Sequence, residues 1–191
     1  MLTFVTGNAG KLLDAQKVLA RFHLQVRGQA VDFDEPRSDD LAVIARAKIR
    51  QAARQIPAPL FVQDSGLFID ALRGFPGTQV NFALRTIGME GIRKLLVGEK
   101  NRRCCFRQCV GYWDGAQEHL FFSEMPGVLT EELCGVERPE QPSPLWRIFR
   151  PDGADKTVAE FTQEELEAYM DRDGRALREL GCFLQGKEQK E

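Results

Sequence analysis

A β-hairpin near the middle of the chain is the feature that most restricts how this sequence folds. Residues 104–113 and 118–124 are strand-like runs, and an Asp-Gly pair at 114–115 separates them. Asp-Gly between two such runs is a strong signal of a tight hairpin turn, because both residues tolerate the backbone angles that the turn needs. We therefore predict that the two runs pair as antiparallel strands.

Strands and helices alternate before this hairpin. Short apolar runs predict strands at residues 2–5, 24–27, 60–62 and 67–72. Apolar residues one helical turn apart predict helices at residues 11–22, 41–55 and 80–97. A capping box, Thr162-x-x-Glu165, predicts another helix from Gln163, and a last helix is expected at 173–184. Early alternation followed by a hairpin places the chain in the α/β class with a mixed sheet.

The composition fits a single globular domain that spans residues 1–191. The net charge of -2 gives no general attraction to nucleic-acid backbones, and no apolar stretch is long enough to cross a membrane. The N-terminal residues lack the basic leader of a signal peptide. We therefore expect a cytoplasmic protein whose partners include neither nucleic acid nor a membrane.

Cysteine and histidine usage points away from disulfides and from zinc. The five cysteines are odd in number and contain no Cys-x-x-Cys motif. Reduced thiols in the core of a cytosolic protein are the favoured interpretation. Neither His23 nor His119 lies near a cysteine or an acidic cluster, so a zinc site is not expected.

The segment Thr6-Gly7-Asn8-Ala9-Gly10-Lys11 joins the first predicted strand to the first predicted helix. Glycines let a ligand approach the backbone, helix N-terminal amides attract anions, and a lysine adds a full positive charge. The segment is not a Walker A loop, because Leu12 follows the lysine. It indicates a phosphate site, although a glycine-rich turn without a ligand explains the same residues.

Two acidic positions are candidates for binding a hard cation. Asp64 precedes Ser65-Gly66 at the end of the strand predicted at 60–62, where α/β folds place their sites. The alternative is an Asx-turn, in which the carboxylate bonds its own backbone. The pair Asp39-Asp40 precedes the second helix, so it supplies a helix cap, a magnesium ligand or both.

Together these segments resemble the inosine triphosphate pyrophosphatase family, the noncanonical purine nucleoside triphosphate pyrophosphatases. The similarity starts with Thr6-Gly7-Asn8 and Lys11 and continues with Phe61-Val62-Gln63-Asp64-Ser65-Gly66-Leu67. The motifs Gly74-Phe75-Pro76-Gly77 and Arg85-Thr86-Ile87-Gly88 follow in the same order. The C-terminal part matches through Lys156-Thr157, Ala159-Glu160 and Gly174-Arg175-Ala176-Leu177. The similarity covers nearly the whole chain.

The resemblance implies a long mixed central sheet with two lobes around a substrate cleft, and a homodimer. It implies hydrolysis of a nucleoside triphosphate to a nucleoside monophosphate and pyrophosphate, with Mg²⁺ as the cofactor. Asp64 would be the catalytic proton acceptor and, together with Asp40, a metal ligand. The residues expected to bind substrate are Thr6, Gly7, Asn8, Lys11, Ser65, Trp146 and Lys156. By its local pattern, a turn followed by a short strand at 150–160, Lys156 is an ordinary surface lysine.

The part of the family pattern that reads the base is changed. The family's base loop, Phe-Gly-Tyr/Trp-Asp-Pro, is matched by Ser143-Pro144-Leu145-Trp146-Arg147, with Trp146 where the family has an aspartate. Asp171-Arg172-Asp173 stands at the family's Ser-His-Arg, and Glu167 stands at a family lysine. We therefore expect triphosphate chemistry with altered base recognition. An apolar ring stacks on any base without reading its edge, unless Trp146 instead packs into the core.

Two other functions fit the same residues. A nucleotide-binding module that has lost turnover is motivated by the acidic residues Glu167, Asp171 and Asp173, because carboxylates repel a triphosphate. A pyrophosphatase that acts on a different nucleotide is motivated by the changed base loop. Pyrophosphate release across a panel of nucleotides, measured with magnesium, separates both functions from the leading one.

Overall fold

The computed structural model describes residues 1–136, 143–173 and 175–186. Within them a seven-stranded sheet has the order β2-β1-β3-β5-β6-β7, and β4 pairs with β3. The strands are β1 (Leu2–Val5), β2 (Val26–Gln29), β3 (Leu60–Ile69), β4 (Pro76–Gly77), β5 (Arg103–Trp113), β6 (Glu118–Leu129) and β7 (Phe149–Pro151). The α-helices are α1 (Ala9–Ala20), α2 (Leu41–Ala52), α3 (Val80–Thr86), α4 (Gly88–Leu95), α5 (Gln163–Asp173) and α6 (Arg175–Leu184). The short 3₁₀ helices are η1 (Asp70–Leu72), η2 (Pro144–Arg147) and η3 (Val158–Glu160).

The sheet is mixed, as predicted. β1 pairs in parallel with β2 and β3, whereas β5 runs antiparallel to both β3 and β6. The hairpin of β5 and β6 keeps its register from the pair Arg103 and Val128 to the pair Trp113 and Glu118. The predicted hairpin and the α/β class are therefore confirmed.

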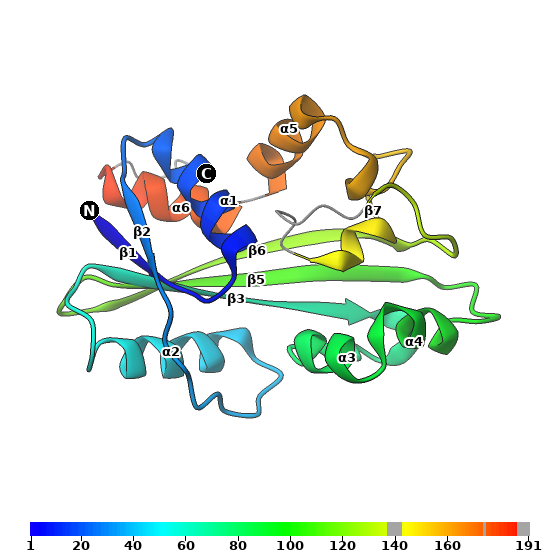
Figure 1. Cartoon of the computed structure of the whole chain (residues 1–191), viewed down its shortest axis with the longest axis horizontal. Coiled ribbons are helices and arrows are strands. Elements are labelled where there is room, and N and C mark those ends of the chain that lie inside the picture. The colour runs from blue at the N-terminus through cyan, green and yellow to red at the C-terminus, as the bar shows by residue number, and fades with distance from the viewer. Residues whose placement is uncertain (137–142, 174, 187–191) are drawn as a thin grey trace.

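The first lobe is built on both faces of the sheet. Helices α1 and α6 cover one face, and α2 covers the other (Figure 1). Phe4 of β1 stacks on Phe61 of β3 with ring centroids 4.3 Å apart, in the core that lies beneath α1 and α6. Ile49 of α2 packs with Val62 of β3 on the opposite face.

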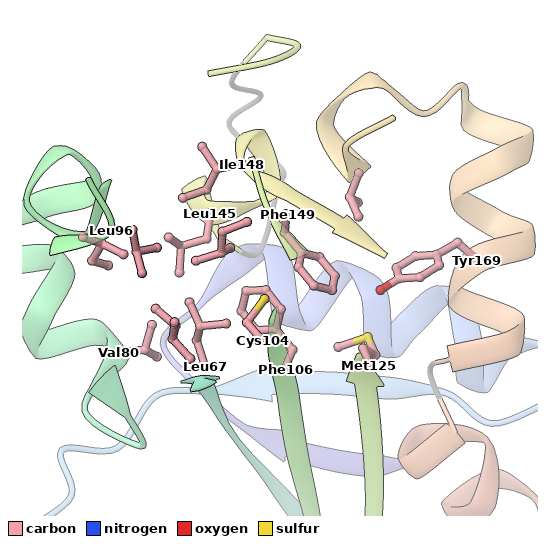
Figure 2. Close-up of a cluster of buried hydrophobic side chains, with 14 of the residues drawn as sticks. Leu67, Val80, Leu96, Cys104, Phe106, Met125, Leu145, Ile148, Phe149 and Tyr169 are labelled. Atoms are coloured by element: carbon pink, nitrogen blue, oxygen red, sulfur yellow. The ribbon is translucent and has the colours of Figure 1, made fainter. Parts of the chain in front are cut away.

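The second lobe surrounds the far ends of the three long strands β3, β5 and β6. Helices α3 and α4 lie on one side of these strands, and η2, β7 and α5 lie on the other (Figure 1). Its core gathers Leu67, Phe106 and Phe149, and Tyr169 reaches it from α5 (Figure 2). The same three strands thus form a common floor for both lobes.

Three features of the side chains and helices bear on the sequence predictions. All five cysteines are free thiols, as the sequence predicts. None of the described helices combines the length and the apolar character needed to cross a membrane. The predicted capping box is also present, because Thr162 N donates to Glu165 Oε2 at 2.7 Å and Glu165 N donates to Thr162 Oγ1 at 3.2 Å.

Four predicted elements were wrong in detail. Residues 60–69 form one strand, β3, because residues 64–66 pair with β5 as regular strand residues, and residues 70–72 of the second predicted run form the 3₁₀ helix η1. Asp64 therefore lies in mid-strand, which excludes the Asx-turn. The helix predicted at 80–97 is two helices, since the helix breaks at Ile87 and Gly88, the first residue of α4, has a φ of 67°. The short strand expected before Glu160 is the 3₁₀ helix η3.

One edge of β3 is paired along only part of its length. β5 covers the opposite edge from Leu60 to Ile69. On the first edge, β1 pairs with residues 60–61 and β4 pairs with residues 67–68. Among the described residues no strand pairs with 62–66 on that side. We refer to this part of β3 as the open edge.

Gly66 allows the chain to pass closely beside β3. A Cβ atom at this position would lie 2.7 Å from the carbonyl oxygen of Gly77 in β4. We expect Gly66→Ala to lower the free energy of unfolding by about 1–3 kcal/mol, because backbone atoms cannot move aside as a side chain can. Gly7→Ala is the matched control, since a Cβ at Gly7 meets nothing within 4 Å. Chemical denaturation measures both variants, and a wild-type midpoint for Gly66→Ala would contradict this account.

Candidate active site

The predicted phosphate segment is a capped helix N-terminus. Asn8 is the N-cap of α1, and its Oδ1 accepts a hydrogen bond from Lys11 N at 3.0 Å. Thr6 Oγ1 accepts from Asn8 N at 3.1 Å, which fixes the turn before the helix. Gly7 is exposed and has open space around it. The helix therefore begins at Ala9, two residues earlier than predicted, and its first amides face a ligand-accessible region.

Lys11 reaches the open edge of β3. Its ammonium lies 3.4 Å from the main-chain oxygen of Gln63, to which it donates. Burial lowers the pKa of Lys11, and the charge of Lys48 acts in the same direction, whereas Asp64 and Glu35 oppose the shift. The charges of Lys48, Asp64 and Glu35 are therefore close enough to Lys11 to change its pKa.

Lys48 joins two carboxylates. Its ammonium lies 2.7 Å from Asp64 Oδ1 and 2.7 Å from Glu35 Oε1. The side chains of Lys48 and Asp64 are only 12% and 13% exposed, whereas Glu35 is 52% exposed. Burial alone would lower the pKa of Lys48, but the contacts with Asp64 and Glu35 raise it above its ordinary value. Lys48 is thus a firmly charged group that fixes the orientation of Asp64.

Asp64 keeps one oxygen without a partner. Its Oδ2 is buried and receives no hydrogen bond within the described residues. An orphaned carboxylate oxygen is costly unless a ligand or an ion completes it. A carboxylate oxygen beside a second carboxylate is a donor set that suits a hard cation such as Mg²⁺.

Asp40 lies on the same side of the sheet but is already engaged. Its Oδ1 accepts from Ala42 N at 2.8 Å, so it is the N-cap of α2, as one sequence interpretation held. Burial raises the pKa of the Cys109 thiol to about 12, and the carboxylates of Asp64 and Asp40 both act in that direction. Asp40 therefore lies near Asp64. Glu35, however, is the carboxylate that shares the partner Lys48 with Asp64. Within the described chain, no group of three His, Cys, Asp or Glu side chains is arranged to hold a metal.

A cleft opens on the opposite face of β3. Side chains alternate along a strand, so Gln63 and Ser65 point away from the face that carries Asp64. Both line a cavity together with Asn8 and Lys11 of α1 and Trp146 of η2. We call this cavity the inner cleft. Lys11 thus stands at the open edge between the inner cleft and the carboxylates.

The inner cleft contains an amide pair that the sequence analysis did not single out. Gln63 Nε2 donates to Gln108 Oε1 at 3.0 Å across β3 and β5. Gln63 Oε1 is buried and has no partner among the described residues. A buried acceptor without a donor costs free energy, so this atom is poised to accept from a bound ligand.

Asp14 lies on α1, about one helical turn after Lys11. It also lines the inner cleft, three residues beyond Lys11 and on the same side of the helix. Burial raises the pKa of the Asp14 carboxyl to about 6, and the charge of Lys17 opposes the shift. A carboxyl group with a raised pKa in a cavity is a common feature of ligand sites.

The remaining predicted residues divide into two groups. Trp146 is half-buried and lines the inner cleft with Ser143 and Pro144, while it also packs against the second-lobe core. Lys156 is not among the lining residues, because its ammonium pairs with Glu165 Oε2 at 2.8 Å. Glu167 accepts from Gln163 Nε2 at 2.7 Å on α5. The side chains of Asp171 and Asp173 lie outside the described part of the chain.

Sequence reasoning missed Glu35, Lys48, Gln63 and Gln108 as site residues. One signal was available for Lys48, since it falls on the buried stripe of α2 with Leu41, Ile44 and Ala45. A lysine on an apolar helix face needs a partner, which pointed to a nearby carboxylate. No comparable signal marks Glu35, because its position depends on the loop before α2.

Comparisons with known proteins agree over nearly the full length. A family model described as the Ham1 family matches residues 2–183. The chain is 39% identical over 183 residues to a dITP/XTP pyrophosphatase of Thermococcus kodakarensis, covering 96% of each chain. It is 42% identical over 163 residues to a dITP/XTP pyrophosphatase of Methanopyrus kandleri, covering 85% of each. A solved HAM1 protein from Coxiella burnetii has the same fold, with a TM-score of 0.78 at 23% identity over 97% of this chain and 98% of that one.

The raised pKa of Asp14 predicts a pH-dependent effect on stability. Since the folded pKa of about 6 exceeds the ordinary value of 3.8, protonation of Asp14 stabilises the fold below pH 4, and this contribution is lost as the pH rises through 6. Asp14→Asn removes the buried charge and is expected to raise the free energy of unfolding by about 1–3 kcal/mol at pH 8. At pH 4 the variant and the wild type should be nearly equal. Denaturation at both pH values checks this, and an equal gain at both would contradict it.

Proposed function

The chain belongs to the Ham1 family, and on that premise we propose that it hydrolyses noncanonical purine nucleoside triphosphates such as dITP and XTP. It is a nucleoside-triphosphate pyrophosphatase, which releases the nucleoside monophosphate and pyrophosphate. One observation of the site carries the proposal. The buried carboxylate of Asp64, fixed by Lys48 and retaining a free oxygen, lies at the open edge beside the N-terminus of α1.

The triphosphate binds across the open edge. The first amides of α1 and the ammonium of Lys11 attract its negative charge. Ser65 adds a hydroxyl group from the floor of the inner cleft. The main-chain N–H of Ser65 faces the open edge, because alternate residues of a strand direct their backbone groups to the same side and the Gln63 carbonyl faces Lys11. The chain thus offers donors from both the helix and the strand.

The carboxylates Asp64 and Glu35 would hold Mg²⁺, with substrate phosphate oxygens completing its coordination. When bound, the ion supplies charge neutralisation at the phosphate oxygens. Asp40 remains the position that the sequence predicts for the second ligand. Lys48 holds Asp64 in position through its ion pair, so that the free Oδ2 of Asp64 can accept the proton of the attacking water. Catalysis is therefore mainly positioning and stabilisation of developing charge.

The two rival functions make different predictions. The binding module requires that the acidic residues repel the triphosphate, but Glu167 is hydrogen-bonded to Gln163 on α5. The pyrophosphatase with a different substrate is supported by the lining of the inner cleft, where Trp146 stands without the family's aspartate. A panel of nucleotides assayed for pyrophosphate separates the three. We expect turnover with inosine and xanthosine triphosphates.

Loss of the catalytic carboxylate is the first test. Asp64→Asn is expected to reduce kcat about a hundredfold or more while the protein stays folded, because Glu35 still pairs with Lys48. Activity of the wild type should require Mg²⁺. Glu35→Gln and Asp40→Asn form a matched pair, and the larger loss identifies the second metal ligand. Near-normal turnover of Asp64→Asn would show that the site is assigned wrongly.

Loss of the phosphate-binding lysine is the second test. Lys11→Ala is expected to weaken binding of a triphosphate about tenfold or more and to leave binding of the nucleoside nearly unchanged. Calorimetric titration with inorganic tripolyphosphate and with inosine measures the two effects separately. Equal losses for both ligands would refute the assignment of Lys11 to phosphate.

A homodimer is implied by the family and has a candidate surface. Phe75 and Phe82 are 44% and 56% exposed and line one groove near β4 and α3. We expect Phe82→Asp to convert a dimer into a monomer, because a charge disrupts an apolar interface. Phe122→Asp is the control, since Phe122 is 51% exposed but lies on β6 away from this groove. Light scattering during size-exclusion chromatography distinguishes the outcomes, and a dimeric Phe82→Asp protein would exclude this surface.

A further inference from the structure

Glu35 lies in an irregular loop that joins β2 to α2 (Figure 1). Residues 30–38 belong to no helix or strand. Glu35 Oε1 lies 2.7 Å from Lys48 Nζ, but the side chain of Glu35 is 52% exposed. Water screens such an exposed contact, and holding the glutamate side chain in one conformation costs entropy. The ion pair alone therefore holds the loop only weakly, and a second support is needed to keep Glu35 beside Asp64.

Gln51, in the last turn of α2, supplies that support. Its Oε1 accepts a hydrogen bond from Asp34 N at 2.9 Å, and its Nε2 donates to Asp34 O at 2.8 Å. Both distances are those of well-formed hydrogen bonds. The Asp34 carbonyl belongs to the peptide group that leads into Glu35, and a peptide group is planar. The two hydrogen bonds, which we call the Gln51 clamp, therefore fix the backbone from which the Glu35 side chain extends.

Phe33 adds an apolar anchor to the same segment. It packs against the hydrophobic core beneath α2, and Lys48 Nζ lies 5.4 Å from the centroid of its ring. Lys48 and Gln51 are three residues apart on α2, so they lie on the same side of the helix. Residues 33–35 are therefore docked along one side of α2 by an aromatic ring, a backbone clamp and an ion pair.

Asp40, the other candidate metal ligand, does not depend on this clamp. Its carboxylate caps α2 by accepting a hydrogen bond from Ala42 N at 2.8 Å. The loop beside it is fastened to the turn before α3, because Thr78 Oγ1 donates to Ser38 O at 2.7 Å. The two carboxylates thus have separate supports, the Gln51 clamp for Glu35 and the helix cap and Thr78 for Asp40.

From these contacts we infer that Gln51 is a positioning residue of the metal site, which holds Glu35 where it can bind Mg²⁺ together with Asp64. The inference rests on the proposed function. Without the clamp, residues 33–35 sample more conformations, and ordering them when the metal binds costs free energy. Residues that orient metal ligands without touching the ion commonly change metal affinity by about 10- to 100-fold. Gln51 therefore acts on the metal through Glu35.

Removal of the clamp is the direct test. Gln51→Met keeps a long unbranched side chain but removes both hydrogen bonds. We expect the dissociation constant for Mn²⁺ to rise about tenfold. Mn²⁺ is the probe because it prefers the same oxygen ligands as Mg²⁺, and electron paramagnetic resonance measures the free ion. Gln55→Met is the matched control, because Gln55 is exposed and lies beyond the end of α2.

The same variant separates metal binding from the chemical step. The Mg²⁺ concentration that gives half-maximal pyrophosphate release should rise in Gln51→Met by a factor similar to that for Mn²⁺. High Mg²⁺ should restore kcat, because the clamp positions a metal ligand and takes no part in the reaction itself. A kcat that stays low at saturating Mg²⁺ would contradict a role through metal binding.

A double-mutant cycle separates positioning of Glu35 from a general structural role. Glu35→Gln alone is expected to weaken Mn²⁺ binding, and Gln51→Met should add no further loss in that background. Thr78→Val, which releases the loop near Asp40, should weaken Mn²⁺ binding less than Gln51→Met does. Wild-type affinity in Gln51→Met, an equal loss with and without Glu35, or a larger loss in Thr78→Val would overturn the inference.

Titration with Mn²⁺ in the absence of nucleotide keeps this inference distinct from the proposed function. A cycle that behaves as expected supports the inference whether or not a triphosphate is hydrolysed. Pyrophosphate release by a protein whose Mn²⁺ affinity does not depend on Gln51 overturns the inference alone. Absence of turnover in a wild type that binds Mn²⁺ overturns the assigned reaction alone.

Discussion

The open edge of β3 is the constraint on which the site depends. β5 pairs with every residue of β3, but on the other side β1 and β4 leave residues 62–66 unpaired among the described strands. Backbone groups at such a gap need other partners, and Lys11 provides one for Gln63. Because side chains alternate, a ligand at this edge meets Asp64 on one face and Ser65 on the other. Because no described strand pairs with residues 62–66 on this edge, the charged residues on one face of β3 and the polar residues on the other are both within reach of one ligand.

The site concentrates charges that oppose folding. Lys11, Lys48 and Asp64 are all withdrawn from water, and such groups are costly unless they are paired. Lys48 offsets part of the cost by contacting Asp64 and Glu35 at once. The hydrophobic cores on both faces of the sheet stabilise the fold and offset the free-energy cost of burying these charges. Poorly satisfied groups remain, such as Asp64 Oδ2, and these are the groups that the proposed function assigns to a substrate or an ion.

The sequence predicted the parts of the structure that are encoded locally. The Asp-Gly hairpin and the capping box at Thr162 were correct because a few neighbouring residues determine each. Continuity of β3 was missed because Asp64-Ser65-Gly66 has the composition of a turn, and only pairing with β5 keeps it extended. Asn8, Lys11, Ser65 and Trp146, which the resemblance gives as substrate-binding residues, line one cavity, and their role in binding stays a prediction. Lys156 was expected with them, but its ion pair with Glu165 depends on how η3 and α5 pack.

The shared floor of the two lobes has a consequence for how selectivity arises. Strands β3 and β5 pair without interruption from one lobe to the other. A hinge motion that moved the lobes apart would therefore break hydrogen bonds between these strands. A cleft on such a floor is preorganised, and little conformational entropy is lost when a nucleotide binds. For the proposed function, this predicts that discrimination between bases relies on fixed complementarity rather than on closure around the correct substrate.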